Sequence, residues 1–363
     1  MILIRFAFLV ALLLLPSALP ASVEFIPPEL RGAVQPQVAV SPAGRIHVVF
    51  GKGNAVYHTA SADGRSFSTP VKVGELEKLA LRMRRGPRVS ATNELIAVTA
   101  ISHADGNLHA WTSADGGATW TETPQINVPA SSAREGLHAL AGDGRGLVAV
   151  AWLDHRGSGT ELWSRVSRDG GRNWQPEARV YASPDGHICE CCHPSLAIGP
   201  RGEIAAMWRN WLGGSRDLWL AVSTDAGATF GAAEKIGVGT WRLNGCPMDG
   251  GAVTFGPTGL PFAVWRREKT VFASEHPDTE QRLADGAAQP VVAVGGAEAV
   301  VVWEQNGDLF VRRGKTAPER LAERAAAPAI AKTPDGKTVV VWESSAGGAP
   351  SLRAEILPPA GQP

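Results

Sequence analysis

The sequence comprises 363 residues, in which 35 Lys and Arg balance 35 Asp and Glu, so that the formal net charge is zero. This balance argues against a nucleic-acid-binding protein, which carries an excess of positive charge. Hydrophobic residues make up 44% of the chain, while 41 Gly and 26 Pro favour an all-β fold of many short strands and turns. The length fits two average domains or one large all-β domain.

Residues 1–21 have the pattern of a secretory signal peptide. One cation, Arg5, precedes an apolar stretch over residues 6–15, and small residues and prolines follow as far as Ala21. The stretch is shorter than the roughly 20 residues that span a bilayer. We therefore expect cleavage near Ala21, a mature domain over residues 22–363, export to a periplasm or to the exterior, and no membrane span after cleavage.

A turn motif recurs four times in the first two-thirds of the chain. Each copy begins Ser-x-Asp, continues through Gly and closes on Phe or Trp, and the intervals between its Asp residues are 52, 54 and 56 residues: Asp63, Asp115, Asp169 and Asp225. Alternating apolar runs flank every copy, which predicts hairpin turns. The Ser and Asp oxygens can accept hydrogen bonds from backbone amides of the turn, and Gly permits a positive φ.

A second motif recurs seven times, as an apolar strand that ends in an aromatic or a small residue. Its copies end at Phe50, Ala100, Trp152, Trp208, Trp265, Trp303 and Trp342. Most copies follow a short extended segment, such as residues 36–40 or 290–294, and precede a third strand and a turn. Units of four antiparallel strands, repeated about 40 to 55 residues apart, indicate an all-β fold of the β-propeller type.

The repeat count predicts a single propeller of seven four-stranded blades, with six blades as the alternative. The last unit shows only three strands, near residues 328–332, 337–343 and 350–357, and residues 22–26 can supply its fourth strand. Joining the two ends of the chain in one blade closes the ring and removes an exposed sheet edge.

The Ser-x-Asp-x-Gly-x-Thr-Trp turns resemble the Asp-boxes, also called BNR repeats, of sialidases and their relatives. The resemblance covers nearly all of residues 22–363 and implies the propeller fold. It also implies that Asp63, Asp115, Asp169 and Asp225 are structural residues on the face away from an active site. Sialidases have six blades, whereas other Asp-box propellers have the seven that we count here.

Links on one face of the predicted ring carry most of the unusual residues. Because the strands alternate in direction, the links that enter an inner strand and those that follow a second strand emerge opposite the Asp-boxes. We call this side the arginine face. Four of its clusters are basic, which predicts a local positive field and an anionic glycan or other carboxylate as ligand; a protein partner stays open as well. The candidate ligand-binding residues are Arg84, Arg85, His155, Arg156, Arg209, Asn210, Arg216, Asp249 and Arg266.

All four cysteines lie in two links of the arginine face. Cys189, Cys191 and Cys192 enter the fourth unit and Cys246 enters the fifth, so the two links should lie side by side. In an exported protein, disulfides that join such loops are one interpretation. A copper or zinc site with thiolate ligands, and with His193, His187 or Met248 as a further ligand, is another. One disulfide with two remaining thiols is the third.

The resemblance implies a particular set of catalytic groups. This sequence has candidates for the arginines of that set but not for its tyrosine nucleophile. Sialidases hold the substrate carboxylate with three arginines and use a Tyr nucleophile that comes late in the chain. The candidates for the arginines are Arg85, Arg209 and Arg266. The two tyrosines are Tyr57 and Tyr181, and the early Arg-Ile-Pro segment is replaced by Phe-Ile-Pro at residues 25–27. We therefore expect no sialoside hydrolysis by the usual mechanism.

Three functions stay open on the sequence. The first is a ligand-binding propeller without catalysis. The second is a divergent glycosidase or lyase, with Asp154 and Glu304 as tentative catalytic groups. The third is an exported metal-binding protein centred on the cysteine cluster. The sequence has no zinc-protease, phosphate-loop or dinucleotide-binding motif.

Overall fold

A computed structural model describes residues 22–296, 298–348 and 350–359. The predicted signal peptide, residues 1–21, lies outside the described residues. Within them the protein has twenty-eight β-strands and one short 3-10 helix, η1 (Pro28–Leu30). No helix in this described part is long and apolar enough to cross a membrane.

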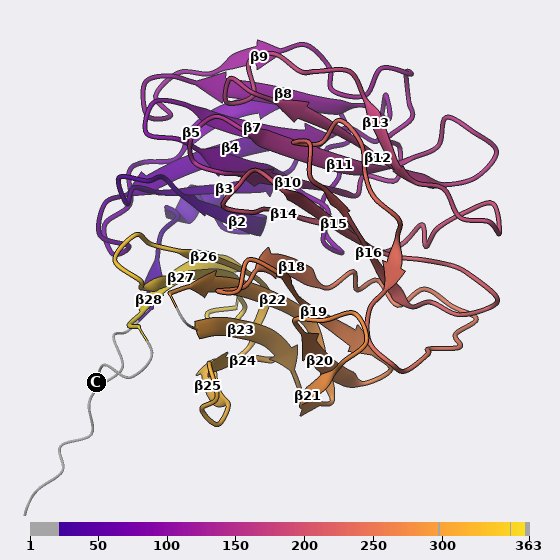
Figure 1. The fold of residues 1–363 in the computed structure, drawn as a ribbon. Coiled ribbons are helices and arrows are strands. Elements are labelled where there is room, and N and C mark those ends of the chain that lie inside the picture. The colour runs from indigo at the N-terminus through magenta and orange to yellow at the C-terminus, as the bar shows by residue number, and fades with distance from the viewer. Residues whose placement is uncertain (1–21, 297, 349, 360–363) are drawn as a thin grey trace, which may run out of the picture.

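The strands form seven four-stranded antiparallel sheets, which are the blades of a propeller (Figure 1). Blade 1 consists of β2 (Val34–Val40), β3 (Ile46–Lys52), β4 (Ala55–Ser61) and β5 (Val71–Glu75), and blade 2 of β6 (Arg88–Ala91), β7 (Ile96–Ile101), β8 (Leu108–Ser113) and β9 (Thr121–Thr123). Blade 3 consists of β10 (His138–Gly142), β11 (Val148–Asp154), β12 (Glu161–Ser167) and β13 (Ala178–Tyr181), and blade 4 of β14 (Ser195–Ile198), β15 (Ile204–Arg209), β16 (Leu218–Ser223) and β17 (Glu234–Lys235). Blade 5 consists of β18 (Ala252–Phe255), β19 (Pro261–Arg267), β20 (Thr270–Ser274) and β21 (Gln281–Asp285), and blade 6 of β22 (Ala287–Gly295), β23 (Glu298–Gln305), β24 (Asp308–Arg313) and β25 (Glu319–Ala322). Blade 7 consists of β26 (Ala325–Lys332), β27 (Thr338–Ser344), β28 (Ser351–Leu357) and β1 (Val23–Glu24).

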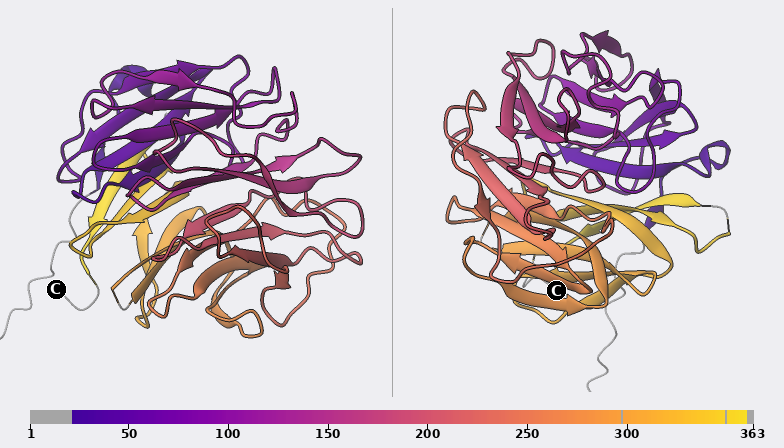
Figure 2. Two further views of the ribbon diagram at one scale, coloured as in Figure 1. Left: turned by 45° about the horizontal axis from the view of Figure 1, so that its top comes forward. Right: turned by 90° about the vertical axis from the view of Figure 1, so that its right-hand side faces the viewer.

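The two ends of the chain close the ring in blade 7. Strand β1 pairs antiparallel with β28, with Val23 opposite Ala354, so that the N-terminal segment is the outer strand of the last blade. Blades 1 and 7, indigo and yellow in Figure 2, therefore lie side by side. Seven blades and closure by the terminal strands are confirmed.

Seven hydrophobic clusters hold the ring together, one at each interface between neighbouring blades. The second strand of a blade is covered on both faces, and every residue of β11 is buried. The tryptophans that end these strands are the largest buried side chains: Trp152, Trp208, Trp303 and Trp342. Because each cluster joins only adjacent blades, the core is a continuous ring without a central mass of side chains.

The Asp-box turns connect the third and fourth strands of blades 1 to 4 and dock each blade on its neighbour. In the fourth turn, Ser223 donates to Asp225 (2.8 Å), and Asp225 accepts the backbone N–H of Thr229 (2.9 Å). Gly227 has a φ of +87°, and a Cβ there would lie 2.5 Å from Cγ1 of Val166 in blade 3. Glycine is thus required both by the backbone and by the close approach of two blades.

Candidate ligand site at the arginine face

The central channel contains two cavities, which meet at an aliphatic ring. The cavity toward the arginine face measures about 210 Å³ and the one toward the Asp-box face about 500 Å³. Each blade contributes one inner-strand residue to the lining of both cavities: Val38, Val89, Leu140, Leu196, Val253, Val292 and Ile330. This set is referred to below as the aliphatic ring. Because it is wholly apolar, the chemistry of the two cavities is separate.

Three basic side chains line the cavity toward the arginine face: Arg84, Arg88 and His193. Arg84 comes from the link that enters blade 2, Arg88 is the first residue of β6, and His193 ends the link that enters blade 4. Their strands begin at this end of the channel, so the side chains converge from different blades. We call this space the arginine cavity.

Arg88 is the most exceptional group of the arginine cavity, because its charge is buried without a counter-ion. Only 8% of the residue is exposed, and none of the described residues forms a salt bridge with it. Its guanidinium donates to the carbonyl oxygens of Arg84, Gly86 and Pro87. Burial, together with the neighbouring charge of Arg84, lowers the pKa of Arg88 to about 9.

Arg84 is held by blades 6 and 7. Its guanidinium donates to the side-chain oxygen of Gln289 (2.7 Å), to the carbonyl of Gln289 (2.7 Å) and to that of Pro328 (2.8 Å). Burial lowers the pKa of Arg84, although the carboxylates of Glu304, Asp249 and Glu343 act in the opposite direction. Arg84 therefore has compensating charges as well as hydrogen-bond partners, whereas Arg88 has hydrogen-bond partners alone.

The three carboxylates near Arg84 share one structural role. Glu343 accepts the backbone N–H of Gln35 (2.8 Å), Asp249 that of Gln289 (2.7 Å) and Glu304 that of Ala327 (2.8 Å). Each of these three donors precedes a proline near the start of an inner strand. Their φ angles are +56° for Gln35, +53° for Gln289 and +52° for Ala327, which lie in the left-handed region that non-glycine residues rarely adopt. The carboxylates thus fix strained backbone at the rim of the arginine cavity.

His193 is a neutral group beside the two arginines. Its Nε2 lies 3.1 Å from the carbonyl oxygen of Gly251, and its Nδ1 has no hydrogen-bond partner within the described part of the chain. Burial first, and then the charges of Arg84 and Arg88, lower its pKa well below the ordinary value. Because the carbonyl oxygen of Gly251 can only accept, Nε2 carries the proton of the neutral ring, and Nδ1 can accept a hydrogen bond from a bound polar group.

The other arginines predicted around blades 4 and 5 are bound by the protein itself. Arg209 is 1% exposed and donates to the carbonyl oxygens of Asp249, Arg216 and Arg266. Its neighbour Asn210 is fully buried and donates to the hydroxyl of Tyr181 (3.0 Å). Arg266 donates to the carbonyl oxygen of Glu268. Arg209 and Asn210 thus join blades and links, whereas Arg266 is half-buried and makes one hydrogen bond, through Nε.

A second polar network fastens the link between β11 and β12 within blade 3. Asp154 is fully buried and accepts hydrogen bonds from Trp152 (2.7 Å) and from Arg156 (2.8 Å), which also pairs with Glu177 (2.8 Å). Although burial raises it, these hydrogen bonds hold the pKa of Asp154 below its ordinary value. Neither Asp154 nor Glu304 lines the arginine cavity.

Arg85 and His155 flank one acidic residue in the same region. Arg85 donates to the carbonyl oxygen of Glu135 (2.7 Å), and His155 lies 3.5 Å from a carboxylate oxygen of Glu135. Burial, and the nearby charge of Arg134, lower the pKa of His155. This pair is separate from the cavity that Arg84 and Arg88 line.

The cysteines divide into a cluster of three and one distant residue. The sulfur atoms of Cys189, Cys191 and Cys192 lie within 4.8 Å of one another, whereas Cys246 is exposed and outside this group. All four are free thiols. Hydrogen bonds from Cys191 and Cys192, and the charge of Arg216, lower the pKa of Cys189.

The two tyrosines do not meet the arginines of the cavity. Tyr57 lies on β4, where it stacks on Phe50 with ring centroids 5.7 Å apart. Tyr181 ends the outer strand β13 and packs on Trp208 at 4.8 Å. Neither tyrosine lines the arginine cavity.

The structure singles out Arg88, which was not among the ligand-binding residues predicted from the sequence. One signal was present in the sequence. Arg88 follows Pro87 at a position where the inner strand of blade 7, after Pro328, has Ala329. A charged residue at a channel-facing position of an inner strand marks a functional candidate, because the residues that follow proline at the same point in other blades are uncharged: Gln37, Ser195, Val291 and Ala329.

The fold and the repeated turns together define a seven-bladed β-propeller of the sialidase-like Asp-box type. Residues 87–243 match the family model of the BNR repeat-like domain, and the predicted resemblance to this family is confirmed. No curated protein sequence matches the chain.

Several solved structures share the fold at low sequence identity. An α-L-arabinanase of Penicillium chrysogenum, complexed with arabinobiose, is 15% identical over 93% of this chain and 98% of its own, with a TM-score of 0.52. A PL25 ulvan lyase, bound to a GlcA(1-4)Rha3S unit, is 12% identical over 93% and 96%, with a TM-score of 0.56. The leech intramolecular trans-sialidase, complexed with 2,7-anhydro-Neu5Ac, is 11% identical over 89% and 68%, with a TM-score of 0.50.

Proposed function

We propose that the protein binds an acidic sugar, whose anionic group enters the arginine cavity and pairs with Arg88. The observation that carries this proposal is the burial of Arg88 without a carboxylate partner. An unpaired buried charge costs several kcal/mol, on the order of the penalty for breaking a buried ion pair. A bound anion removes that cost, so part of the binding free energy is already stored in the free protein.

The hydrogen-bonding capacity of Arg88 supports an oxyanion as the ligand. A guanidinium has five N–H groups, and three hydrogen bonds to carbonyl oxygens account for a part of them. Planar N–H groups match the geometry of a carboxylate or sulfate. The unpartnered Nδ1 of His193 can accept a hydrogen bond from a sugar hydroxyl within the same cavity.

The volume of the arginine cavity limits what enters it. A space of about 210 Å³ accommodates the charged end of one sugar residue, and the remainder of a longer glycan would lie outside, across the links of the arginine face. Among structures with this fold, the ulvan lyase and the leech trans-sialidase are bound to acidic sugars, which supports this ligand class. The pattern of residues 1–21 supports export, where such glycans occur.

The proposal concerns binding, because the two tentative catalytic carboxylates have structural partners. Asp154 is saturated by Trp152 and Arg156, and Glu304 accepts the N–H of Ala327. Turnover of a glycan would need an acid or base close to the anion. The side chain at this position is His193, which its surroundings keep neutral.

Calorimetric titration of the purified protein with glucuronate, N-acetylneuraminate and glucose tests the proposal. We expect both acids to bind, glucose not to bind, and the affinity for the acids to fall as NaCl rises. Arg88→Gln should weaken the binding of the acids at least about tenfold, and Arg88→Lys less, because Lys keeps the charge but not the planar fork.

Arg172→Gln is the matched control, because Arg172 is an exposed arginine of the third Asp-box turn. It should leave the affinity unchanged. Equal binding of glucose and glucuronate, or an Arg88→Gln variant that folds and binds both acids as the parent does, would refute the proposal.

A further inference from the structure

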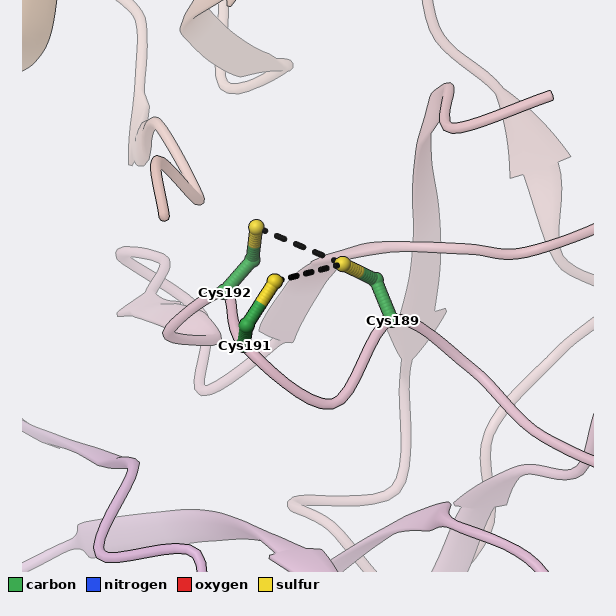
Figure 3. A group of neighbouring side chains, drawn as sticks. All are labelled: Cys189, Cys191 and Cys192. Atoms are coloured by element: carbon green, nitrogen blue, oxygen red, sulfur yellow. Dashed lines mark hydrogen bonds between the residues drawn. The ribbon is translucent and has the colours of Figure 1, made fainter. Parts of the chain in front are cut away.

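Three cysteine sulfurs converge beside the arginine cavity, in the link that enters blade 4 (Figure 3). The Sγ atoms of Cys189 and Cys192 are 3.4 Å apart and those of Cys189 and Cys191 are 3.6 Å apart. Figure 3 shows the three side chains directed toward one another from a single loop. The arginine cavity is lined by other residues of this region, so this cluster is a separate feature.

The spacing of the sulfurs fits a shared metal ion better than a disulfide. A disulfide requires a separation of about 2.05 Å. Thiolates that bind one metal ion at about 2.3 Å lie roughly 3.8 Å apart in a tetrahedral arrangement and about 4.0 Å apart in a trigonal one. The observed 3.4 and 3.6 Å lie close to the metal-bound values and far from the covalent one.

The surroundings of the cluster are built for negative sulfur. A guanidinium nitrogen of Arg216 lies 2.9 Å from Sγ of Cys189, and Arg216 is itself oriented by the carbonyl oxygen of Leu243 and the ring of Trp211. The backbone N–H of Cys189 donates to the carbonyl oxygen of Arg209 (3.0 Å), which ties the link to blade 4. Outer hydrogen bonds of this kind orient metal ligands and balance their charge.

The cluster is largely buried. Cys189 and Cys192 are each 1% exposed, whereas Cys191 is half-buried. None of the other described Cys, His, Asp or Glu residues brings a ligand atom into the same group. Three protein ligands leave a trigonal site, or a tetrahedral site whose fourth position a solvent molecule fills.

We propose that Cys189, Cys191 and Cys192 bind one thiophilic metal ion, Zn²⁺ or Cu⁺, through three thiolates, with Arg216 as a hydrogen-bonding second layer. Binding releases the thiol protons, so the ion replaces protons at the three sulfurs without any change of oxidation state. The site uses none of the residues that contact the proposed sugar.

Metal analysis of the folded protein tests this proposal. The protein is purified under reducing conditions, loaded separately with Zn²⁺ and with Cu⁺, and dialysed, and its metal content is then measured against competing chromophoric chelators. We expect one equivalent of one of these ions, and Co²⁺ should produce the intense near-ultraviolet absorption of cobalt-thiolate bonds. The chelator titrations with the two ions show which one the site prefers.

Single substitutions assign the ligands. Cys191→Ser, at the least buried position, and Cys192→Ser should each lower the retained metal at least about tenfold, while Cys246→Ser, the matched control, should keep one equivalent. Arg88→Gln should also keep the metal, so failure of the sugar proposal and failure of this one are distinguishable. Reduced, folded protein that retains no ion, or a Cys191→Ser variant that retains as much as the parent, would overturn the proposal. Peptide mapping that finds a Cys189–Cys192 disulfide in place of metal would do the same.

Discussion

Substitution of Asp154 by Asn tests whether this buried carboxylate fastens the link that follows β11 to its own blade, blade 3. Asp154 accepts four hydrogen bonds, from the indole of Trp152 and from the backbone N–H, Nε and a terminal nitrogen of Arg156, over distances of 2.7 to 2.9 Å. An amide keeps only one of the two accepting oxygens, so two donors would face an N–H₂ group. Hydrogen bonds to charged groups contribute about 1.5 to 3 kcal/mol each.

The expected loss in the free energy of unfolding is therefore about 3 kcal/mol. This value includes a discount, because Arg156 keeps its ion pair with Glu177 and is 20% exposed. Urea unfolding followed by tryptophan fluorescence measures the loss, with an unchanged slope as evidence that both proteins unfold alike. Asp278→Asn, at an exposed carboxylate, is the control and should change the stability by less than about 0.5 kcal/mol. A loss below about 1 kcal/mol for Asp154→Asn would refute the structural role.

Three more measurements test the ring and its turns. Phe25→Ala should lower the free energy of unfolding in urea by about 3 kcal/mol, because the buried side chain of Phe25 packs on Phe67, with centroids 4.9 Å apart, where blades 7 and 1 meet. Leu260→Ala, at an exposed position, is the control and should cost little. Gly227→Ala should cost about 2 kcal/mol by the same assay, because a Cβ would collide with Val166 at a positive φ; a neutral result would contradict the docking role of the turn. Hydrogen bonds from Thr229 lower the pKa of Asp225 from 3.8 to about 2, so the contribution of Asp225 to stability should be complete above pH 3.8 and disappear as the pH falls toward 2. Asp225→Asn should therefore reduce the fall in melting temperature between pH 3.8 and 2. A pH profile that this substitution leaves unchanged would contradict the prediction.

The propeller could be predicted from the sequence because its signals are local and repeated. The position of Trp152, Trp208, Trp303 and Trp342 at the ends of second strands follows from a period that the chain shows seven times. The pairing of Val23 with the last blade was predictable for a different reason, since the final unit lacked one strand and residues 22–26 had no place in another unit.

The site could be predicted only as a face of the molecule. Arg209 and Arg88 look alike in the sequence, as cations next to apolar strands. The two arginines differ in their hydrogen-bond partners. Arg209 donates to three carbonyl oxygens, two of which belong to residues 40 or more positions away, whereas Arg88 donates only to carbonyl oxygens of its own link. Such partners depend on how the blades are rotated against each other, which no local pattern encodes.

The same limit applies to the cysteines. The two cysteine-bearing links belong to consecutive blades, but the direction of each side chain depends on the path of its loop. Three sulfurs turn inward beneath Arg216, while Cys246 turns to solvent. Spacing alone could not separate these outcomes, because Cys-x-Cys-Cys is compatible with several loop paths.

If an acidic sugar binds at Arg88 as proposed, the aliphatic ring in the channel limits the route by which it leaves. An anion at Arg88 would have to lose its water to pass Val89 and Leu140 toward the Asp-box face, which is costly for any ion. The proposed ligand would therefore enter and leave through the arginine face, and would not pass through the larger cavity toward the Asp-box face. The residence time of an acidic sugar should then be set by the loops of one face alone, so that changes there alter kinetics while the opposite end of the molecule remains a passive support.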